Sequence, residues 1–521
     1  MTDPGEQEAT APVDRAGLQD GAVRGAAWTV IHTLISLPLA FVVNLVVART
    51  LGISDYGRLA FLSSVMDVAG GIITLGFGTA LIQFGSRYHA SGRGDELRHL
   101  LSAAQGFRLL VAAPLLSLVV FLVADVDPQM LVLAIVFGIL VPSAFDGASA
   151  CLWIENKSAA GAKIALISSL ASSAAVLAVV FTIGTPDAVW ATRLVVGGAS
   201  VALGLIPISP SYRRAVLQPR LPRGLPPGFW RFTIPTAIAG VIGGLVVSRS
   251  EIFFMTWLAT PAAVGAFALA YGLASHIFAP AQAFIGPLVP AISSLREIDA
   301  GSLASAFRRT LRAGSTFVGV ITAGAVAALA LLVPVLYGHQ YVSAAPLVVA
   351  LGISSGLLVV ATPVTAFVTS RLSAGELLRA NIIALVVDVV LAVTLIPFID
   401  VWGAVIANVG SAATRLLILM RREIELLDLT WRDVAGQSLP AVLGALVCVA
   451  SWFIARTLGF GLLPAVVAAL VGAVGMLALL RLTRSGLTPG DSASITRTFG
   501  ARIQRFGRPL LSLVTQRREE G

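Results

Sequence analysis

The sequence predicts an all-α integral membrane protein with about fourteen transmembrane helices, and three observations support this fold class. Of the 521 residues, 57% are hydrophobic and only 12% are charged, which is about half the charged fraction of a soluble domain. Apolar runs recur along the chain, each near the 20 residues that a helix needs to span about 30 Å of hydrocarbon. Strands of membrane barrels are about half as long and alternate polar with apolar residues, so a barrel is disfavoured.

The predicted spans follow one another through mostly short connections. They cover 25–48, 59–84, 100–123, 128–152, 162–183, 188–209, 232–257, 264–290, 313–336, 343–369, 381–398, 401–420, 437–455 and 462–480. The resulting organisation is a cytoplasmic N-terminal tail (1–24), an N-lobe of six spans (25–209), a cytoplasmic linker (210–231), a C-lobe of six spans (232–420), two further spans (437–480) and a basic cytoplasmic tail (481–521).

The segment 210–231 is rich in proline and arginine, so we interpret it as the linker between the two lobes. An internal repeat supports that division. Leu51-Gly-Ile-Ser-Asp-Tyr-Gly57 follows the first span, and Leu258-Ala-Thr-Pro-Ala-Ala-Val-Gly265 follows the seventh. Both are short turns that glycine closes at the start of the next helix. Because six spans separate the copies, the two pseudo-symmetric lobes are expected to have the same orientation in the membrane.

The distribution of basic residues predicts the orientation. One set of connections and tails carries 29 of the 36 lysines and arginines, and the opposite set carries only Arg49, Arg58 and Arg456. By the positive-inside rule the richer side is cytoplasmic, so both termini face the cytoplasm of a cell whose inner (cytoplasmic) membrane holds the protein. The external connections are too short for a folded domain.

Familiar catalytic signatures are missing from the sequence. Lys157 follows Asn and Lys163 follows Ala, so neither belongs to a phosphate-binding P-loop. Cys151 and Cys448 lie in apolar runs, which argues against a disulfide framework or a metal cluster. No arginine run is interleaved with aromatic residues, so nucleic acid is a poor candidate partner. We therefore expect a transporter without a cofactor, not an enzyme.

Charged residues within spans are the main candidate functional residues, because an ion at the bilayer centre costs about 2.5–3.5 kcal/mol or more. Asp67 lies in the second span, and Arg249 and Glu251 lie in the seventh, all in the outer half. We expect Arg249 to form an anion site with Asp67 or Glu251 as its counter-ion. The alternative is a salt bridge at a gate that never contacts substrate.

Two further sets of charges lie within single lobes. Arg108 and Asp146 occur toward the inner side of the N-lobe, whereas Asp388 and Arg415 occur nearer mid-depth in the C-lobe. Each set is expected to form an intramembrane ion pair, and substrate binding is the alternative for both.

A last group of candidates surrounds the first span. Arg49 and Arg58 flank the first external turn, where they would receive a phosphate at the exit or bind outer-leaflet headgroups. His32 and Asn44 lie within the span and either line a central path or hydrogen-bond to neighbouring helices.

The sequence resembles the MOP superfamily flippases, specifically the Wzx-like polysaccharide biosynthesis proteins. The resemblance rests on Ala48–Gly57 and on Arg249-Ser-Glu251 followed by Leu258–Gly265, and by layout it covers about residues 20–480. It implies two six-helix lobes with two extra helices around a cationic cavity, with Glu251 at a position where many relatives have an acid. It also implies alternating-access translocation of polyprenyl-pyrophosphate-linked oligosaccharide, with membrane lipids, glycosyltransferases and a polymerase as partners.

Three rival functions remain open at this point. A cation-coupled multidrug exporter of the same superfamily commonly has an acid in its first span, which here contains only His32 and Asn44 as notable polar groups. A lipid II flippase is poorly separated by sequence. A membrane glycosyltransferase or polymerase would be expected to have a substantial external loop, which the predicted layout lacks.

Overall fold

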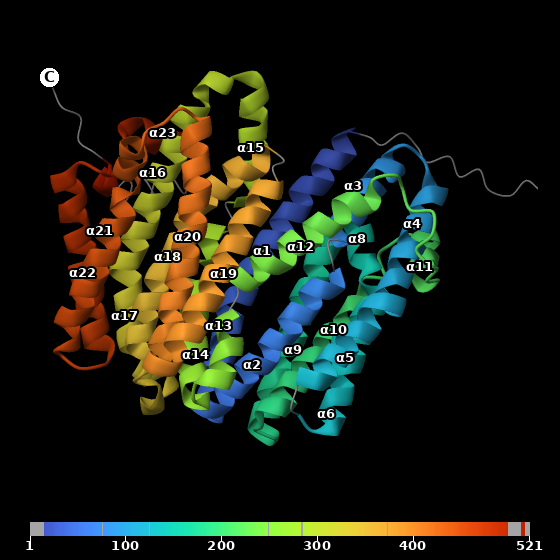
Figure 1. The fold of residues 1–521 in the computed structure, drawn as a ribbon, viewed down its shortest axis with the longest axis horizontal. Helices are drawn as coiled ribbons and strands as arrows, with labels where there is room; N and C mark the ends of the chain where they lie inside the picture. The colour runs from blue at the N-terminus through green and yellow to red at the C-terminus, as the bar shows by residue number, and fades with distance from the viewer. Residues whose placement is uncertain are drawn as a thin grey trace, which may run out of the picture. The chain divides into compact units, whose positions relative to one another are not determined.

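The computed structural model describes residues 15–74, 77–123, 126–247, 250–282, 285–371, 374–498 and 512–515. These residues are nearly all helical (Figure 1), and the β-structure among them is one isolated bridge between Leu487 and Thr515. Eleven helices in this part of the chain are long and apolar enough to cross a membrane. The predicted fold class, an all-α integral membrane protein, is confirmed.

The total of fourteen spans stays a prediction. The three predicted spans outside the eleven are 59–84, 188–209 and 232–257. The structure is nevertheless helical there, with α2 and α3 in the first, α10 in the second, and α12 and α13 in the third.

The chain divides into two compact units. The N-unit comprises residues 1–51 and 62–244, and the C-unit comprises residues 52–61 and 245–521. Compactness thus places the division within α12, whereas the sequence pattern placed a lobe boundary at 210–231. The first part of that stretch is helix α11, and the backbone N–H of Arg220 donates to the carbonyl of Ser102 at 2.9 Å. The linker is therefore packed against the N-unit.

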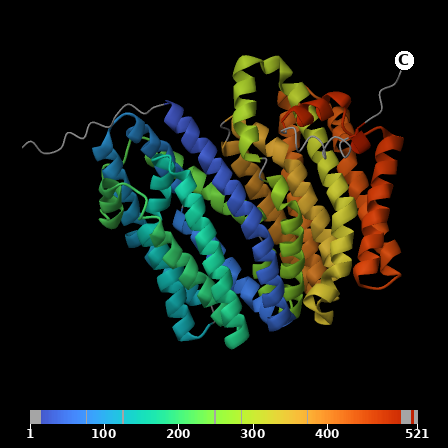
Figure 2. The ribbon, with the colours of Figure 1, turned by 180° about the vertical axis from the view of Figure 1, so that it is seen from behind.

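The N-unit contains the first twelve α-helices. They are α1 (Arg15–Leu51), α2 (Ile53–Thr74, whose first residues belong to the C-unit), α3 (Phe77–Ala90), α4 (Gly94–Phe107), α5 (Ala113–Val123), α6 (Pro128–Leu133), α7 (Val141–Phe145), α8 (Gly147–Ile154), α9 (Ser158–Thr182), α10 (Pro186–Leu203), α11 (Pro210–Leu217) and α12 (Phe229–Val247). Two π-helical stretches, Arg108–Ala112 and Ala134–Leu140, interrupt the α4–α5 and α6–α7 rods. In Figure 2, α1 runs beside α9, in agreement with their contacts.

The C-unit contains the remaining helices. They are α13 (Ser250–Leu258), α14 (Pro261–Gln282), α15 (Ile285–Ile298), α16 (Leu303–Ile321), α17 (Ala327–Tyr337), α18 (Ala344–Ser370), α19 (Ala374–Ile399), α20 (Val401–Leu426), α21 (Trp431–Arg456), α22 (Leu462–Thr483) and α23 (Pro489–Thr498). Short 3-10 turns occur at Ala300–Ser302 and His339–Tyr341, and a π-helical stretch at Thr322–Val326.

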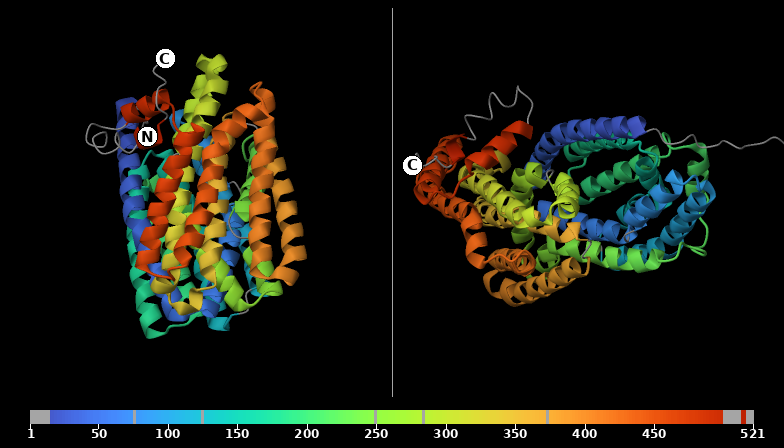
Figure 3. Two further views of the ribbon diagram at one scale, coloured as in Figure 1. Left: turned by 90° about the vertical axis from the view of Figure 1, so that its left-hand side faces the viewer. Right: turned by 90° about the horizontal axis from the view of Figure 1, so that it is seen from above.

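Helix α18 lies at the centre of the C-unit, with most of its side chains buried against α14, α16, α17 and α20. Helices α19 and α20 form an antiparallel hairpin, and α21 and α22 form another (Figure 3). The turns recognised as repeats meet in this unit. A Cβ atom on Gly265 would lie 1.8 Å from the Ile53 carbonyl oxygen, and one on Gly57 would lie 2.4 Å from that of Pro261. Only glycine permits this close approach of two backbones.

Candidate functional site

A group of five buried polar residues lies between helices of the C-unit. This buried acidic cluster consists of Ser250 and Glu251 on α13, Ser354 on α18, Asp388 on α19 and Asn408 on α20, each at most 4% exposed. The amide of Asn408 donates to Oε1 of Glu251 at 2.8 Å and accepts from Oγ of Ser354 at 2.6 Å. Ser250 donates its hydroxyl to Oδ2 of Asp388. Four helices therefore contribute side chains to one polar site.

The register of the α19–α20 hairpin determines which side chains meet in this cluster. Arg415 donates its Nε–H to Oδ1 of Asn381 at 2.9 Å, and the hydroxyl of Ser411 donates to the carbonyl of Ala384 at 3.1 Å. Two turns nearer the connection, Asp388 reaches the level of Asn408. Asn381 and Asp388 are about 10 Å apart along the helix, at 1.5 Å per residue.

The predicted ion pair between Asp388 and Arg415 is therefore replaced by two other contacts. Arg415 bonds to Asn381 and Asp388 accepts from Ser250, and the structure records no ion pair between the two charges among the described residues. Their similar depth suggested the pairing, but the hairpin offsets them by about two helical turns. The sequence marks both acids as unusual and Asn408 as a polar group within a span, whereas Ser250 and Ser354 carry no signal to separate them from other small polar residues.

The cluster places two acids, Glu251 and Asp388, at the same buried site. The carboxyl groups of Glu251 and Asp388 are neighbours in the cluster and interact electrostatically. In the described part of the chain, neither has a basic side chain within ion-pair distance, and Oε2 of Glu251 and Oδ1 of Asp388 have no donor. Two adjacent buried carboxylates repel each other and lose their hydration. Chemically, such a pair is suited to hold a proton or a small cation between its oxygens.

The candidate ion pair of the N-unit forms between two interrupted helices. NH2 of Arg108 lies 2.8 Å from Oδ2 of Asp146, and the Arg108 side chain is fully buried while that of Asp146 is 26% exposed. Gln105 donates to the carbonyl of Ser143 one turn away. Arg108 begins the first π-helical stretch, and among the described residues none of its three side-chain nitrogens has a hydrogen-bond acceptor, NH2 having only the ion-pair contact. The pair thus joins α4 to α7 within the N-unit.

The other residues singled out by sequence are distributed between the two units. Asn44 on α1 accepts a hydrogen bond from NH2 of Arg193 at 3.0 Å, so it joins α1 to α10. His32 on α1 is half-buried. Arg49 at the end of α1, Asp67 within α2 and Arg58 near the start of α2 have exposed side chains, with Arg58 in the C-unit and the other two in the N-unit. Arg249 lies outside the described residues.

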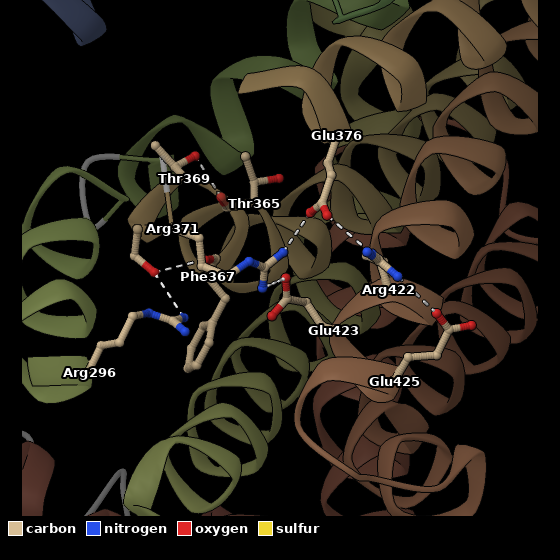
Figure 4. A network of polar contacts seen from close by, with 10 residues as sticks. Arg296, Thr365, Phe367, Thr369, Arg371, Glu376, Arg422, Glu423 and Glu425 are labelled. Atoms are coloured by element: carbon tan, nitrogen blue, oxygen red, sulfur yellow. Dashed lines mark hydrogen bonds and ion pairs between the residues drawn. The ribbon is translucent and has the colours of Figure 1, made fainter. Parts of the chain in front are cut away.

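A network of ion pairs that the sequence did not predict joins three helix ends of the C-unit (Figure 4). Arg371, after the end of α18, pairs with Glu423 on α20 and with Glu376 on α19 at 2.8 Å. Arg422 also pairs with Glu376, at 3.1 Å. Because Glu423 is completely buried, Arg371 compensates a charge that water does not reach. This Arg371 network fixes the ends of α18, α19 and α20 relative to one another.

Within the described residues there is no group of three or more histidine, cysteine, aspartate or glutamate side chains suited to hold a metal ion. The acidic cluster has two carboxyls with neutral amide and hydroxyl neighbours. Oxygen ligands of this kind suit a proton or a hard monovalent cation better than a transition metal.

The family model for polysaccharide biosynthesis proteins matches residues 22–296, which is more than half of the chain. The chain belongs to the polysaccharide biosynthesis protein family. A search of curated proteins found no match. The matched region includes the N-unit from α1 onward and ends in α15 of the C-unit, so it contains Glu251 but not Asp388.

Solved structures show the fold of this family member. The lipid II flippase MurJ, in an inward closed conformation, is similar with a TM-score of 0.65 and 12% identity, over 87% of this chain and 98% of that one. A multidrug resistance MATE transporter of the MOP superfamily is similar in its outward-facing conformation, with a TM-score of 0.51, 15% identity, and coverage of 79% of this chain and 97% of the other. The family member has the fold of a MOP-type transporter.

Proposed function

We propose that this protein is a flippase that moves polyprenyl-pyrophosphate-linked oligosaccharide across the cytoplasmic membrane by alternating access, for the synthesis of cell-surface polysaccharide. Membership of the polysaccharide biosynthesis family supports the cargo class. A headgroup with many hydroxyls and two phosphates loses its hydration in hydrocarbon, so it requires a polar path through protein. The lipid tail would remain in the bilayer throughout.

The buried acidic cluster is the observation that carries the transport mechanism. A site with two facing carboxyls changes its energy strongly when a positive charge enters or leaves. Suppose that Glu251 and Asp388 are accessible in one conformation of the transport cycle and not in the other. Binding of a proton or a monovalent cation then shifts the populations of the two conformations. We therefore propose that cation entry at this cluster supplies the free energy that drives the flippase.

The pyrophosphate of the cargo requires cationic partners. We assign this role to Arg249, and to Arg49 and Arg58 at the exit, because guanidinium groups form charge-assisted, bidentate hydrogen bonds to phosphate oxygens. Asp67, His32 and Asn44 would line the same route and contact the sugar hydroxyls. Glu251, by contrast, serves in the acidic cluster, where Asn408 already holds one of its oxygens.

Reconstituted vesicles provide the test. Fluorescent lipid-linked oligosaccharide is placed in both leaflets, and its accessibility to an external quencher is followed with and without a proton or sodium gradient. We expect the gradient to accelerate flipping by the natural sequence. We expect at least about a tenfold loss of that acceleration in the double variant Glu251→Gln with Asp388→Asn, because neutral amides need no counter-charge.

Asp400→Asn is the matched control, since Asp400 is exposed in the α19–α20 turn at a positive φ of 50° that asparagine also adopts. Gradient-driven flipping at the natural rate in the double variant would overturn the coupling mechanism. If the Arg249→Ala variant flips the cargo at the natural rate, Arg249 does not bind the cargo.

Lipid II is a second candidate cargo, favoured by the likeness in fold to the lipid II flippase MurJ. A multidrug exporter is the third, favoured by the likeness to the MATE transporter. The same vesicles loaded with lipid II, or with a cationic dye, separate the three. We expect the oligosaccharide to move fastest, because the family match is to polysaccharide biosynthesis proteins.

Both termini would face the cytoplasm, where glycosyltransferases assemble the lipid-linked cargo, and a polymerase on the other side would consume it. The excess of arginine on one set of connections supports this orientation.

A further inference from the structure

A basic pocket lies in the C-unit, apart from the buried acidic cluster. Its volume is about 430 Å³, and it lies where the first turns of α16 meet α21 and the start of α23. Figure 1 shows α23 beside α16 and α21 at one end of the unit. The lining residues are Ser305, Arg308, Arg309, Arg312, Gln437, Thr488 and Gly490.

One helical segment contributes all three arginines of the basic pocket. Arg308 and Arg312 are four residues apart on α16, so they lie one above the other on the same face, and Arg309 is three residues from Arg312. Nε of Arg309 and Nε of Arg312 donate to the two oxygens of Asp491, at 2.9 and 2.8 Å. Arg312 also donates to Oε1 of Gln437 at 3.0 Å. The guanidinium groups of Arg309 and Arg312 are therefore held in place before any ligand arrives.

Asp491 is itself fixed at the start of α23. Its carboxylate accepts from the backbone N–H of Thr488 at 3.1 Å, and its own N–H donates to the Thr488 hydroxyl at 3.3 Å. Burial alone would raise the pKa of Asp491, but the hydrogen bonds from Thr488 and Arg309 and the charge of Arg312 lower it below its ordinary value. The carboxylate thus stays ionised and acts as a positioning group for the arginines.

The basic pocket retains positive charge after these contacts. Among the described residues, Arg309 and Arg312 both form ion pairs with one carboxylate, that of Asp491. Asp433 acts electrostatically on Arg308. Its Oδ2 accepts from the N–H and hydroxyl of Thr430 at the start of α21, and no ion pair joins it to Arg308 among the described residues. Counted over the described residues, three arginines therefore face two carboxylates, those of Asp491 and Asp433, and arginine, threonine and glutamine side chains of the lining supply hydrogen-bond donors.

The position of the pocket indicates the kind of anion. The apolar stretch of α16 begins directly after Arg312, and α22 ends just before the connection to Thr488. The arginines therefore lie where a membrane helix leaves the hydrocarbon, at the depth of lipid phosphates. We propose that the basic pocket binds a phosphate group, presented by an anionic phospholipid or by a soluble phosphate ester. Arg308 and Arg309 would contact it, positioned by Arg312 and Asp491.

The test uses the full-length purified protein in detergent. Binding of short-chain phosphatidic acid and of inorganic pyrophosphate is titrated separately, for the natural sequence and for the double variant Arg308→Gln with Arg309→Gln. Loss of two charged donors is expected to weaken binding by about tenfold or more. Arg432→Gln is the matched control, because Arg432 is exposed on α21 and does not line the pocket. Thermal unfolding of each variant shows whether the fold is retained.

The two probes distinguish the sources of the phosphate. Phosphatidic acid binding that the double variant weakens, with pyrophosphate unable to compete, supports a lipid headgroup. Pyrophosphate binding that the same variant weakens supports a soluble ligand at the same site. If neither probe binds, or if the double variant and Arg432→Gln bind equally well, the basic pocket is not a phosphate site. Because no flipping is measured, the result is independent of the proposed transport function.

Discussion

Arg108 has a fully buried side chain, although it carries a permanent charge within the N-unit. Its guanidinium group has Asp146 as its anionic partner, and none of its three nitrogens has a hydrogen-bond acceptor among the described residues. A buried arginine of this kind is expensive unless its charge is compensated. Its position at the start of a π-helical stretch indicates that the backbone has adapted to place it there.

Removing Asp146 tests this interpretation. Asp146→Ala is expected to lower the free energy of unfolding by about 3 kcal/mol, at the low end for a broken buried pair because Asp146 is partly exposed. The double variant Arg108→Met with Asp146→Ala is expected to recover most of the loss, since no buried charge remains. Thermal unfolding in detergent measures both. Equal losses in the single and double variants would show that the pair matters through packing alone.

Asp491 provides a prediction about pH. Its pKa is lower in the folded protein than the ordinary value of 3.8, so ionised Asp491 stabilises the fold at pH above that value. This contribution is lost as pH falls through the lowered pKa. We expect Asp491→Asn to unfold at a lower temperature than the natural sequence at pH 7, with the difference shrinking below about pH 4. A difference that is constant over this range would indicate that the charge of Asp491 is not responsible.

At the scale of elements, close helix packing depends on small residues. Helices α16 and α21 touch at Gly319 and Gly444, where a Cβ atom on Gly444 would lie 2.4 Å from the Cα atom of Gly319. In membranes, where water does not drive helices together, such close contacts supply much of the association energy. Gly436, on the same helix, has nothing within 4 Å of the corresponding position.

Alanine substitutions at these two glycines are expected to act in opposite directions. Gly444→Ala forces backbones apart and is expected to destabilise the protein by about 1–3 kcal/mol. Gly436→Ala meets no neighbour and is expected to be neutral or stabilising by up to about 1 kcal/mol, because alanine favours the helix. Unfolding curves of the two variants in one detergent give the comparison. A similar loss for both would point to helix propensity and away from packing.

The hairpin α19–α20 shows how an element decides a site. The local sequence predicts both helices and shows that they carry Asp388 and Arg415. The contact that each of these residues makes depends on the antiparallel register of the hairpin. Arg415 contacts Asn381, which precedes Asp388 by seven residues on α19. Sequence spacing within one helix gives the face of a residue, whereas its neighbour on another helix depends on the turn and on packing.

At the scale of the whole molecule, the predicted orientation can be measured directly. Cys151 and Cys448 are buried, so a background with both replaced by alanine accepts single reporter cysteines. Thr457→Cys lies in the connection between α21 and α22, and Ser91→Cys lies in that between α3 and α4. We expect a membrane-impermeant maleimide to label Thr457→Cys in intact cells and Ser91→Cys only after permeabilisation. The reverse result would invert the proposed direction of transport.

Local sequence patterns are enough to predict the membrane fold class and the family resemblance. Both follow from the residues of each segment alone, because each span must be apolar over about 20 residues whatever helices surround it. The sequence also marked the ionised residues within spans, since each is costly there. The family match and the fold agree with the predicted family and fold class.

Which of these charged groups contact one another depends on how the helices pack. Glu251 and Asp388 are 137 residues apart in the sequence, and they share one cluster because α13, α19 and α20 pack side by side. Asp491 likewise reaches Arg309 and Arg312 from beyond the last long helix. The cost of burying a charged residue in a span can be inferred from the local sequence. The groups that compensate the charge lie on other helices, and those contacts form only when the helices pack.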